Sequence, residues 1–322
     1  MNIPMIFQKS AFLVGAIALA TIPQMATAAP EPIHIGSGQP PVNVMKNAMP
    51  KFPTFNKLVP KPGFVRGFVK DTTGKPLQGA KIGVRSTAVG GSYSGSQGTT
   101  DARGYYEVKV PWGAAHFYCA GYTIDYGEGR AALGLHPVDG EAETFPSGKG
   151  HIENWVLLPY GIADRDGASE RPSYANNYYG GTLFFDYHIN DERPLFANDQ
   201  YLPPGSEIEV LLSPVGKLID GSQGQSFCFR KKVDGGGAGF DSFALNNIPV
   251  GIYDVSARLI EGGNPSPLRM NETGPYSGRP FGIEPKEARG KARLLLRASG
   301  AKADMAVAQH GNWDSVTISL ER

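Results

Sequence analysis

The sequence has few of the features that mark ionic or redox functions. The chain has 322 residues but only two cysteines, Cys119 and Cys228, and its 31 basic and 30 acidic side chains form no long run of one sign. A nearly neutral chain lacks the charge that attracts phosphate backbones or anionic lipid surfaces. We therefore expect no nucleic-acid partner. The cysteines, in different predicted domains, form either one disulfide in an oxidising compartment or two buried thiols.

The chain also lacks an apolar stretch long enough to cross a membrane. The apolar segment 11–20 is shorter than the roughly 20 residues that a spanning helix needs. Lys9 precedes this segment and the small residues ATA follow at 26–28, which is the pattern of a secretory signal peptide. The sequence therefore predicts that residues 1–28 are cleaved near Ala28, that the chain is secreted or periplasmic, and that no transmembrane anchor remains.

Sequence patterns of common enzyme classes are missing. None of the six histidines has a glutamate three positions on, and neither Gly-x-Ser-x-Gly nor His-x-His occurs. His136 and His188 have an aspartate at that spacing, without a third candidate ligand. Residues 164–170 resemble a calcium loop, but the glycine is fourth instead of sixth, which favours a solvated linker. We expect no catalytic residue, metal or cofactor; an uncharacterised hydrolase or metal-dependent enzyme is the second alternative.

Glycine and proline are abundant in the chain. The 42 glycines and 26 prolines, with few long helical patterns, favour many short strands joined by tight turns. Residues 29–62 hold eight prolines and predict an extended arm, which either links domains or packs on another surface. At roughly 150 residues per domain, the length predicts two domains.

The segments 64–71 and 99–113 show the clearest strand patterns. In the first, Val65 and Val69 alternate with residues of the opposite face. The second, TTDARGYYEVKVPWG, starts with a tight turn at 101–104 and continues as an alternating strand. Pro111 has no amide proton to donate to a sheet, so this strand should end there.

These segments carry a resemblance to a known family. GFVRGFVKDTTGKPLQGAKIGV, TTDARGYYEVKVPWG and AHFYCAGY, within 63–123, resemble the carboxypeptidase regulatory-like domain, which implies a transthyretin-like sandwich of about seven strands. A weaker echo lies at 240–263, where Ile248-Pro249-Val250-Gly251 precedes an alternating strand. The resemblance implies a fold and says little about chemistry. The matching positions are Gly74, Pro76, Leu77, Gly79, Ala80, Asp101, Gly104, Tyr105, Gly113, Gly121 and Tyr122.

Strand patterns at 180–191, 206–214, 291–299 and 313–322 predict that the second half is all-β as well. The predicted fold class is all-β, with two tandem antiparallel β-sandwiches, the first transthyretin-like. The predicted organisation is a signal peptide (1–28), a Pro-rich arm (29–62), a first sandwich (63–160), a linker (161–179) and a second sandwich (180–322).

Aromatic residues near predicted loops are the candidate ligand site. Aromatic planes stack on the apolar faces of sugar rings, and asparagine side chains can bond the hydroxyls. The alternative for each tyrosine is a structural role with the ring buried. The candidates are Trp112, Tyr126, Tyr174, Asn176, Asn177, Tyr178 and Tyr179.

The sequence therefore predicts a secreted, non-catalytic binding or interaction module. Its partner is either a glycan or an envelope or extracellular protein, bound in the second case through sheet edges or the Pro-rich arm.

Overall fold

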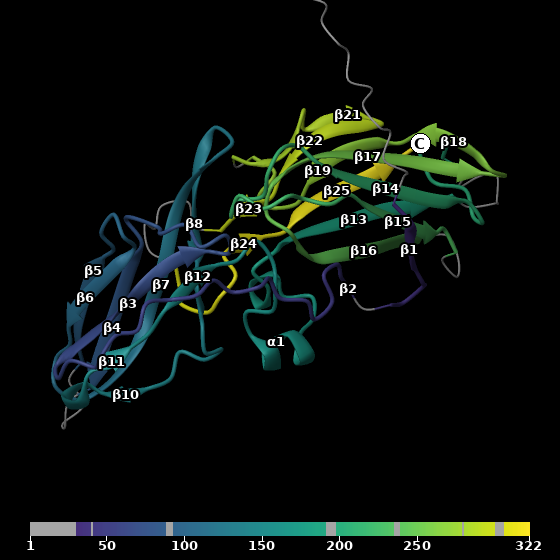
Figure 1. Cartoon of the computed structure of the whole chain (residues 1–322). Coiled ribbons are helices and arrows are strands. Elements are labelled where there is room, and N and C mark those ends of the chain that lie inside the picture. Colours follow the sequence, from purple (N-terminus) through teal and green to yellow (C-terminus); the bar gives the residue numbers. More distant parts are fainter. Residues whose placement is uncertain are drawn as a thin grey trace, which may run out of the picture.

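The computed structural model describes residues 30–39, 41–87, 93–190, 198–234, 239–278, 280–299 and 306–322. The predicted signal peptide, 1–28, lies outside this range. The described chain is nearly all β, as predicted, and its strands form two bodies side by side (Figure 1). No helix in the described ranges is long and apolar enough to cross a membrane.

The first body consists of two five-stranded sheets. One has the order β10-β7-β4-β5, with β8 also paired to β7; the other has the order β11-β3-β12-β9, with β6 also paired to β3. The strands are β3 (Phe64–Asp71), β4 (Lys81–Thr87), β5 (Tyr93–Thr99), β6 (Tyr105–Lys109), β7 (Ala114–Tyr126), β8 (Gly129–Gly134), β9 (His136–Pro137), β10 (Phe145–Pro146), β11 (His151–Ile152) and β12 (Trp155–Leu157), and a 3₁₀ turn, η1, covers Ser147–Lys149.

The turn before β6 explains the motif that begins there. The Asp101 carboxylate accepts hydrogen bonds from the backbone amides of Arg103 and Tyr105, at 2.9 and 3.0 Å. Gly104 has φ +71°, and a Cβ there would lie 2.4 Å from the Val69 carbonyl oxygen, so only glycine fits. β6 ends at Lys109, as the proline at 111 predicts.

The second body is a sandwich of a seven-stranded and a six-stranded sheet. The first has the order β1-β15-β14-β17-β22-β20, with β18 paired to β17; the second has the order β2-β16-β13-β25-β19-β21. The strands are β1 (Pro32–Ile35), β2 (Val42–Asn43), β13 (Gly181–Ile189), β14 (Glu207–Pro214), β15 (Phe227–Lys232), β16 (Gly239–Ile248), β17 (Ile252–Glu261), β18 (Asn264–Pro267), β19 (Arg269–Thr273), β20 (Gly282–Glu284), β21 (Glu287–Arg289), β22 (Lys291–Leu295) and β25 (Val316–Glu321).

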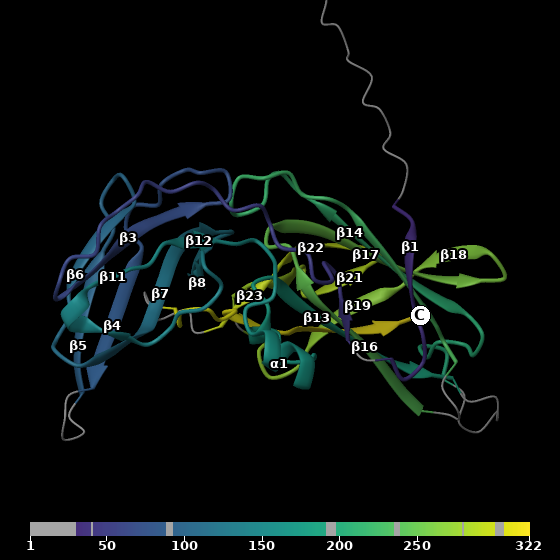
Figure 2. The same cartoon turned by 60° about the horizontal axis from the view of Figure 1, so that its bottom comes forward.

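The Pro-rich arm is part of both bodies. β1 pairs in parallel with β15, and β2 pairs in parallel with β16, so the arm adds an edge strand to each sheet of the second body (Figure 2). It then runs to the first body, where Phe52 and Phe55 pack against a cluster around Val156 and Leu158. The arm thus covers two strand edges that would otherwise be open.

The segment between the bodies is exposed in its first half and packed in its second. Residues 164–166 and 169–171 are exposed, as the predicted solvated linker at 164–170 requires, whereas Ala175 and residues 177–179 are buried. The segment contains the short helix α1 (Arg165–Glu170) and the 3₁₀ turn η2 (Ala175–Asn177), and β23 (Arg297–Ala298) and β24 (Trp313–Asp314) pair beside it. Most of the buried apolar side chains of the two bodies belong to one connected cluster. Asp164 and Asn177 bond to backbone groups of Gly167 and Arg171, whereas Asp166 and Glu170 are exposed.

Tyr126 is the clearest bond between the bodies. Its ring is buried, and its hydroxyl donates to the Gly251 carbonyl at 3.0 Å and accepts from the Leu296 amide at 2.9 Å. The Trp313 indole donates to the Tyr179 carbonyl at 2.8 Å across the same junction. These bonds satisfy backbone groups that water does not reach.

We expect Tyr126→Phe to lower the free energy of unfolding by about 1–3 kcal/mol, because it leaves a buried donor and a buried acceptor unpaired. Urea denaturation measures this loss. Tyr118→Phe is the matched control, since the Tyr118 hydroxyl only accepts a bond from the Gln97 side chain near the surface, and its cost should stay below about 0.5 kcal/mol. Equal losses in the two variants would contradict the role given to Tyr126.

Both cysteines are free and buried, which settles the two alternatives in favour of thiols. Burial raises the pKa of Cys119 to about 11 and also raises the pKa of Cys228. A thiol with a raised pKa holds little thiolate at neutral pH and reacts slowly. We expect Ellman's reagent to titrate no thiol quickly in the folded chain and two thiols in urea. A count of zero in urea would reveal a disulfide instead.

Candidate functional site

The structure does not bring the predicted aromatic site together on an exposed face. Trp112 is 71% exposed and lies in the turn after β6, whereas Tyr174 is 46% exposed and lies before η2. Tyr126, Tyr178 and Tyr179 are buried. These three tyrosines therefore have the buried, structural position that was the stated alternative, whereas ligand binding by the two exposed residues stays a prediction.

The two predicted asparagines also have structural partners. The buried Asn177 side chain donates to the Arg171 carbonyl at 2.9 Å, and the Asn176 side-chain oxygen accepts from the Trp313 amide at 3.1 Å. Both bonds hold η2 in the junction. The sequence could not separate this role from ligand binding, because an asparagine beside tyrosines has the same composition in either setting.

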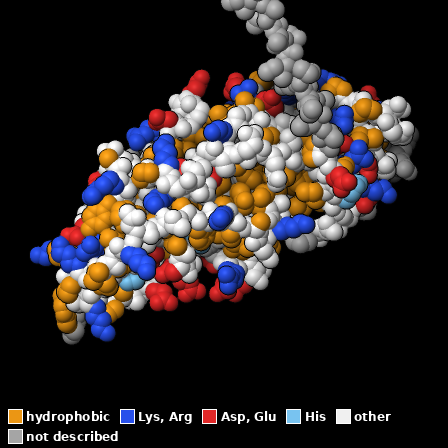
Figure 3. All heavy atoms as spheres, in the orientation of Figure 1, with side chains coloured by type: hydrophobic (Ala, Val, Ile, Leu, Met, Phe, Trp, Pro, Cys, Tyr) orange, Lys and Arg blue, Asp and Glu red, His pale blue; other side chains and the backbone are white. Residues whose placement is uncertain are grey.

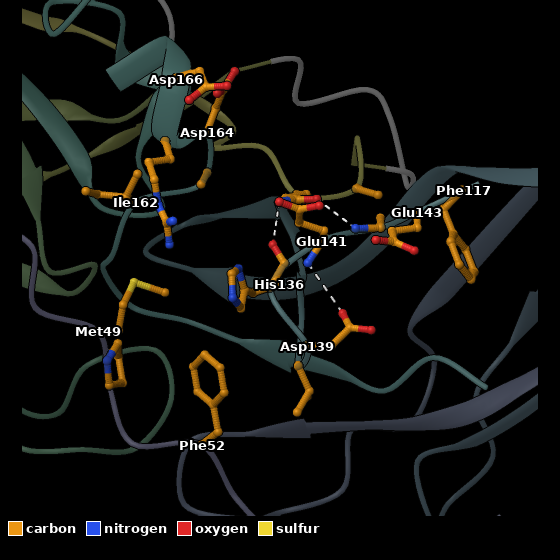
Figure 4. Close-up of a pocket in the computed structure, with 18 of the residues that line it drawn as sticks. Met49, Phe52, Phe117, His136, Asp139, Glu141, Glu143, Ile162, Asp164 and Asp166 are labelled. Atoms are coloured by element: carbon orange, nitrogen blue, oxygen red, sulfur yellow. Dashed lines mark hydrogen bonds between the residues drawn. The ribbon is translucent and has the colours of Figure 1, made fainter. Parts of the chain in front are cut away.

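A groove of about 1240 Å³ opens beside the junction. Figure 4 shows that its labelled side chains come from several segments: Asp164 and Asp166 lie beside α1, and Glu141 and Glu143 lie on the loop after β9. Residues far apart in the sequence meet here: 47–52 of the arm, 136–143 after β8, 162–166 of the connecting segment, and 308–309.

The middle of the groove is apolar and carries one buried histidine. His136 is 6% exposed, its ring lies 5.3 Å from the Phe52 ring, and its Nδ1 is 3.0 Å from the Tyr179 hydroxyl. Desolvation lowers the pKa of His136 to about 4, so the imidazole is neutral at pH 7. The aspartate at 139 points elsewhere in Figure 4, so the spacing seen in the sequence does not create a metal pair.

The rim of the groove is acidic. Five carboxylates line it against the single guanidinium of Arg165, and acidic side chains gather along the lower edge of the surface near α1 (Figure 3). Gln309 holds the loop after β9 in place, because its side chain accepts from the Ala142 amide at 3.0 Å and donates to the Gly140 carbonyl at 2.8 Å. The carboxylates belong to Asp139, Glu141, Glu143, Asp164 and Asp166.

The segment that resembled a calcium loop, 164–170, forms α1 and its N-cap. The Asp164 side chain accepts from the Gly167 amide at 2.8 Å, as an N-cap does. Among the described residues, no group of three or more His, Cys, Asp or Glu side chains is arranged to hold a metal ion.

The acidic rim was not among the sites that the sequence predicted. Asp139, Glu141 and Glu143 alternate along the chain, which is a visible signal, but α1 contributes the other side of the groove. Only the folded chain brings the two acidic segments to one opening.

No family model and no curated protein sequence matches the chain. Among solved structures, the Bacillus anthracis TIE protein is 12% identical with a TM-score of 0.30, and the match covers 80% of this chain and 34% of that one. A streptococcal ancillary pilin is 13% identical with a TM-score of 0.21, covering 80% and 62% of the two chains. The shaft pilin SpaA from Lactobacillus rhamnosus GG is 12% identical with a TM-score of 0.22, covering 81% and 98%.

This chain therefore spans about a third of the first of these proteins and 62% of the second. TM-scores this low carry no argument about family or function. The sheets of the two bodies show the β-sandwich architecture directly. Any proposal about function must come from the chemistry of the groove.

The lowered pKa of His136 predicts a loss of stability in mild acid. The unfolded chain takes up a proton near pH 6.5, whereas the folded chain resists it until about pH 4. The free energy of unfolding should therefore fall by about 2 kcal/mol between pH 7 and pH 5. Urea titrations of the wild type and His136→Gln at both pH values measure this. The variant should lose this part of the pH dependence, and an unchanged difference would contradict the assignment.

Proposed function

We propose that this chain is a secreted, non-catalytic docking module, and that its acidic groove binds an extended basic segment of an envelope or extracellular protein. The observation that carries the proposal is the gathering of five carboxylates around one opening in an otherwise neutral chain. Summed charges of one sign in a cleft attract ligands of the opposite sign and speed their association.

The size of the groove supports a polymeric ligand. Its volume of about 1240 Å³ exceeds the roughly 300–1,000 Å³ typical of small-molecule pockets. Its apolar middle, formed by Met49, Phe52 and the neutral His136, suits the aliphatic stems of lysine or arginine side chains, while their charged ends reach the acidic rim. A neutral glycan would gain less from five carboxylates, so the groove favours the protein partner.

The composition of the lining supports a non-catalytic role. The described residues that line the groove include no serine, threonine, cysteine or lysine as a nucleophile. The histidine that could act as a base is held by Tyr179 and is a weak base, because its pKa is about 4.

Secretion and the relationship to the carboxypeptidase regulatory-like domain are parts of the same proposal. Secretion is supported by the signal-peptide pattern in the first 28 residues. The family relationship is supported by Gly74, Gly79 and Gly104, three motif glycines that adopt positive φ in turns of the first body.

Fluorescence anisotropy with a labelled decapeptide of alternating lysine and glycine tests the docking role. We expect binding at low salt that weakens steeply as ionic strength rises, because exposed charges are screened. The triple variant Asp139→Asn/Glu141→Gln/Glu143→Gln should weaken binding about ten-fold or more.

The control variant, Asp125→Asn/Glu128→Gln/Glu284→Gln, removes the same charge at exposed positions outside the groove. It should bind almost as the wild type does. Equal effects of the two triple variants, or no binding of the basic peptide at low salt, would refute the proposal.

A further inference from the structure

The outer face of the six-stranded sheet carries an ordered row of polar side chains. Ser242, Asp186, Ser319 and Asn271 are direct cross-strand neighbours on β16, β13, β25 and β19. All four are partly exposed, whereas the residues that flank them in sequence on β13 and β25 point into the sandwich core. Because directly opposed residues share a face, these side chains line up across the sheet.

An aromatic cluster lies one pleat from this row. His188 follows Asp186 by two positions on β13, about 7 Å along the strand on the same face, and Phe240 is its cross-strand neighbour on β16. The Tyr201 ring stacks on His188 with centroids 4.7 Å apart, and the Phe240 ring lies 5.7 Å from His188. Phe240 is 59% exposed, so much of its ring is open to a ligand.

The polar row has unused hydrogen-bonding capacity. Among the described residues, the Asp186 carboxylate has neither a hydrogen-bond nor an ion-pair partner. The Oδ1 of Asn271 also has no partner among them, but it is buried, so Asn271 meets a ligand through its amide nitrogen. The charges beside the row nearly balance, because Arg269 pairs with Glu287 at 3.6 Å and with Glu321 at 3.7 Å, and the exposed Arg289 is the cross-strand neighbour of Arg269. The groups that the row itself offers are therefore two hydroxyls, an amide and one carboxylate.

We infer that this face is a binding platform for a neutral oligosaccharide. The aromatic cluster offers an apolar surface to one face of a sugar ring, and the row of Ser242, Asp186, Ser319 and Asn271 bonds the hydroxyls. Four side chains on adjacent strands about 4.8 Å apart cover about 14 Å, which suits a chain of sugars better than a single one. The near-neutral charge of the face matches a neutral glycan.

The position of the row argues against a protein strand as the occupant. An added strand pairs with the backbone at the edge of a sheet. The row crosses the middle of the sheet, and β2 lies at one edge and β21 at the other. This platform lies on the second body and shares no residue with the groove, so the inference is independent of the docking proposal.

A glycan array that includes neutral and anionic oligosaccharides, probed with the full chain, is the first test. We expect at least one neutral oligosaccharide to be retained, and calorimetry with that sugar then gives its affinity. Phe240→Ala and Asp186→Ala should each weaken binding about ten-fold, whereas Phe240→Trp should preserve it because it keeps an aromatic plane. The groove variant Asp139→Asn/Glu141→Gln/Glu143→Gln should bind the sugar normally.

Val59→Ala is the control, because Val59 is a 75% exposed apolar residue outside the platform. It should leave sugar binding unchanged. The inference is wrong if no neutral oligosaccharide is retained, if only anionic glycans bind, or if Val59→Ala abolishes binding while Phe240→Ala and Asp186→Ala do not.

Discussion

The packed junction between the two bodies is the constraint on which the rest of the molecule depends. Tyr126 bonds two backbone groups of the second body, and Trp313 bonds the backbone beside the first. Separating the bodies would expose the apolar cluster that they share, and breaking these bonds while the groups stay buried would leave costly unpaired polar groups. The junction therefore holds the two sandwiches as one unit and fixes the surfaces beside it.

The arm reinforces this arrangement from the outside. Its strands β1 and β2 belong to the second body, and its next residues pack on the first. One continuous segment thus contributes to both bodies and to the wall of the groove, through Met49 and Phe52. Because the groove is built from the arm, the first body and the connecting segment together, its acidic rim exists only when all of them are in place.

The two proposed binding surfaces attract their ligands by different forces. The groove gathers negative charge over an apolar middle, so its attraction for a ligand is long-range and sensitive to salt. The outer face of the six-stranded sheet carries little uncompensated charge, so recognition there depends on ring stacking and on short, directional hydrogen bonds. A chain with both surfaces would hold a basic protein segment and a glycan at a fixed separation.

The sequence by itself determined the strands, because an alternating pattern such as Tyr106 and Val108 against Glu107 is a local property of the chain. Turns with glycine at positive φ, such as the one at Gly104, could also be predicted, because they too depend only on neighbouring residues. The contacts of Tyr126, Tyr178 and Tyr179 could not be predicted, because a tyrosine fits the same sequence pattern whether its ring lies in a junction or on a surface. Only the tertiary structure decided which aromatic rings are exposed, which acidic segments share a groove and which polar side chains align across a sheet, since those depend on contacts between residues far apart in the sequence.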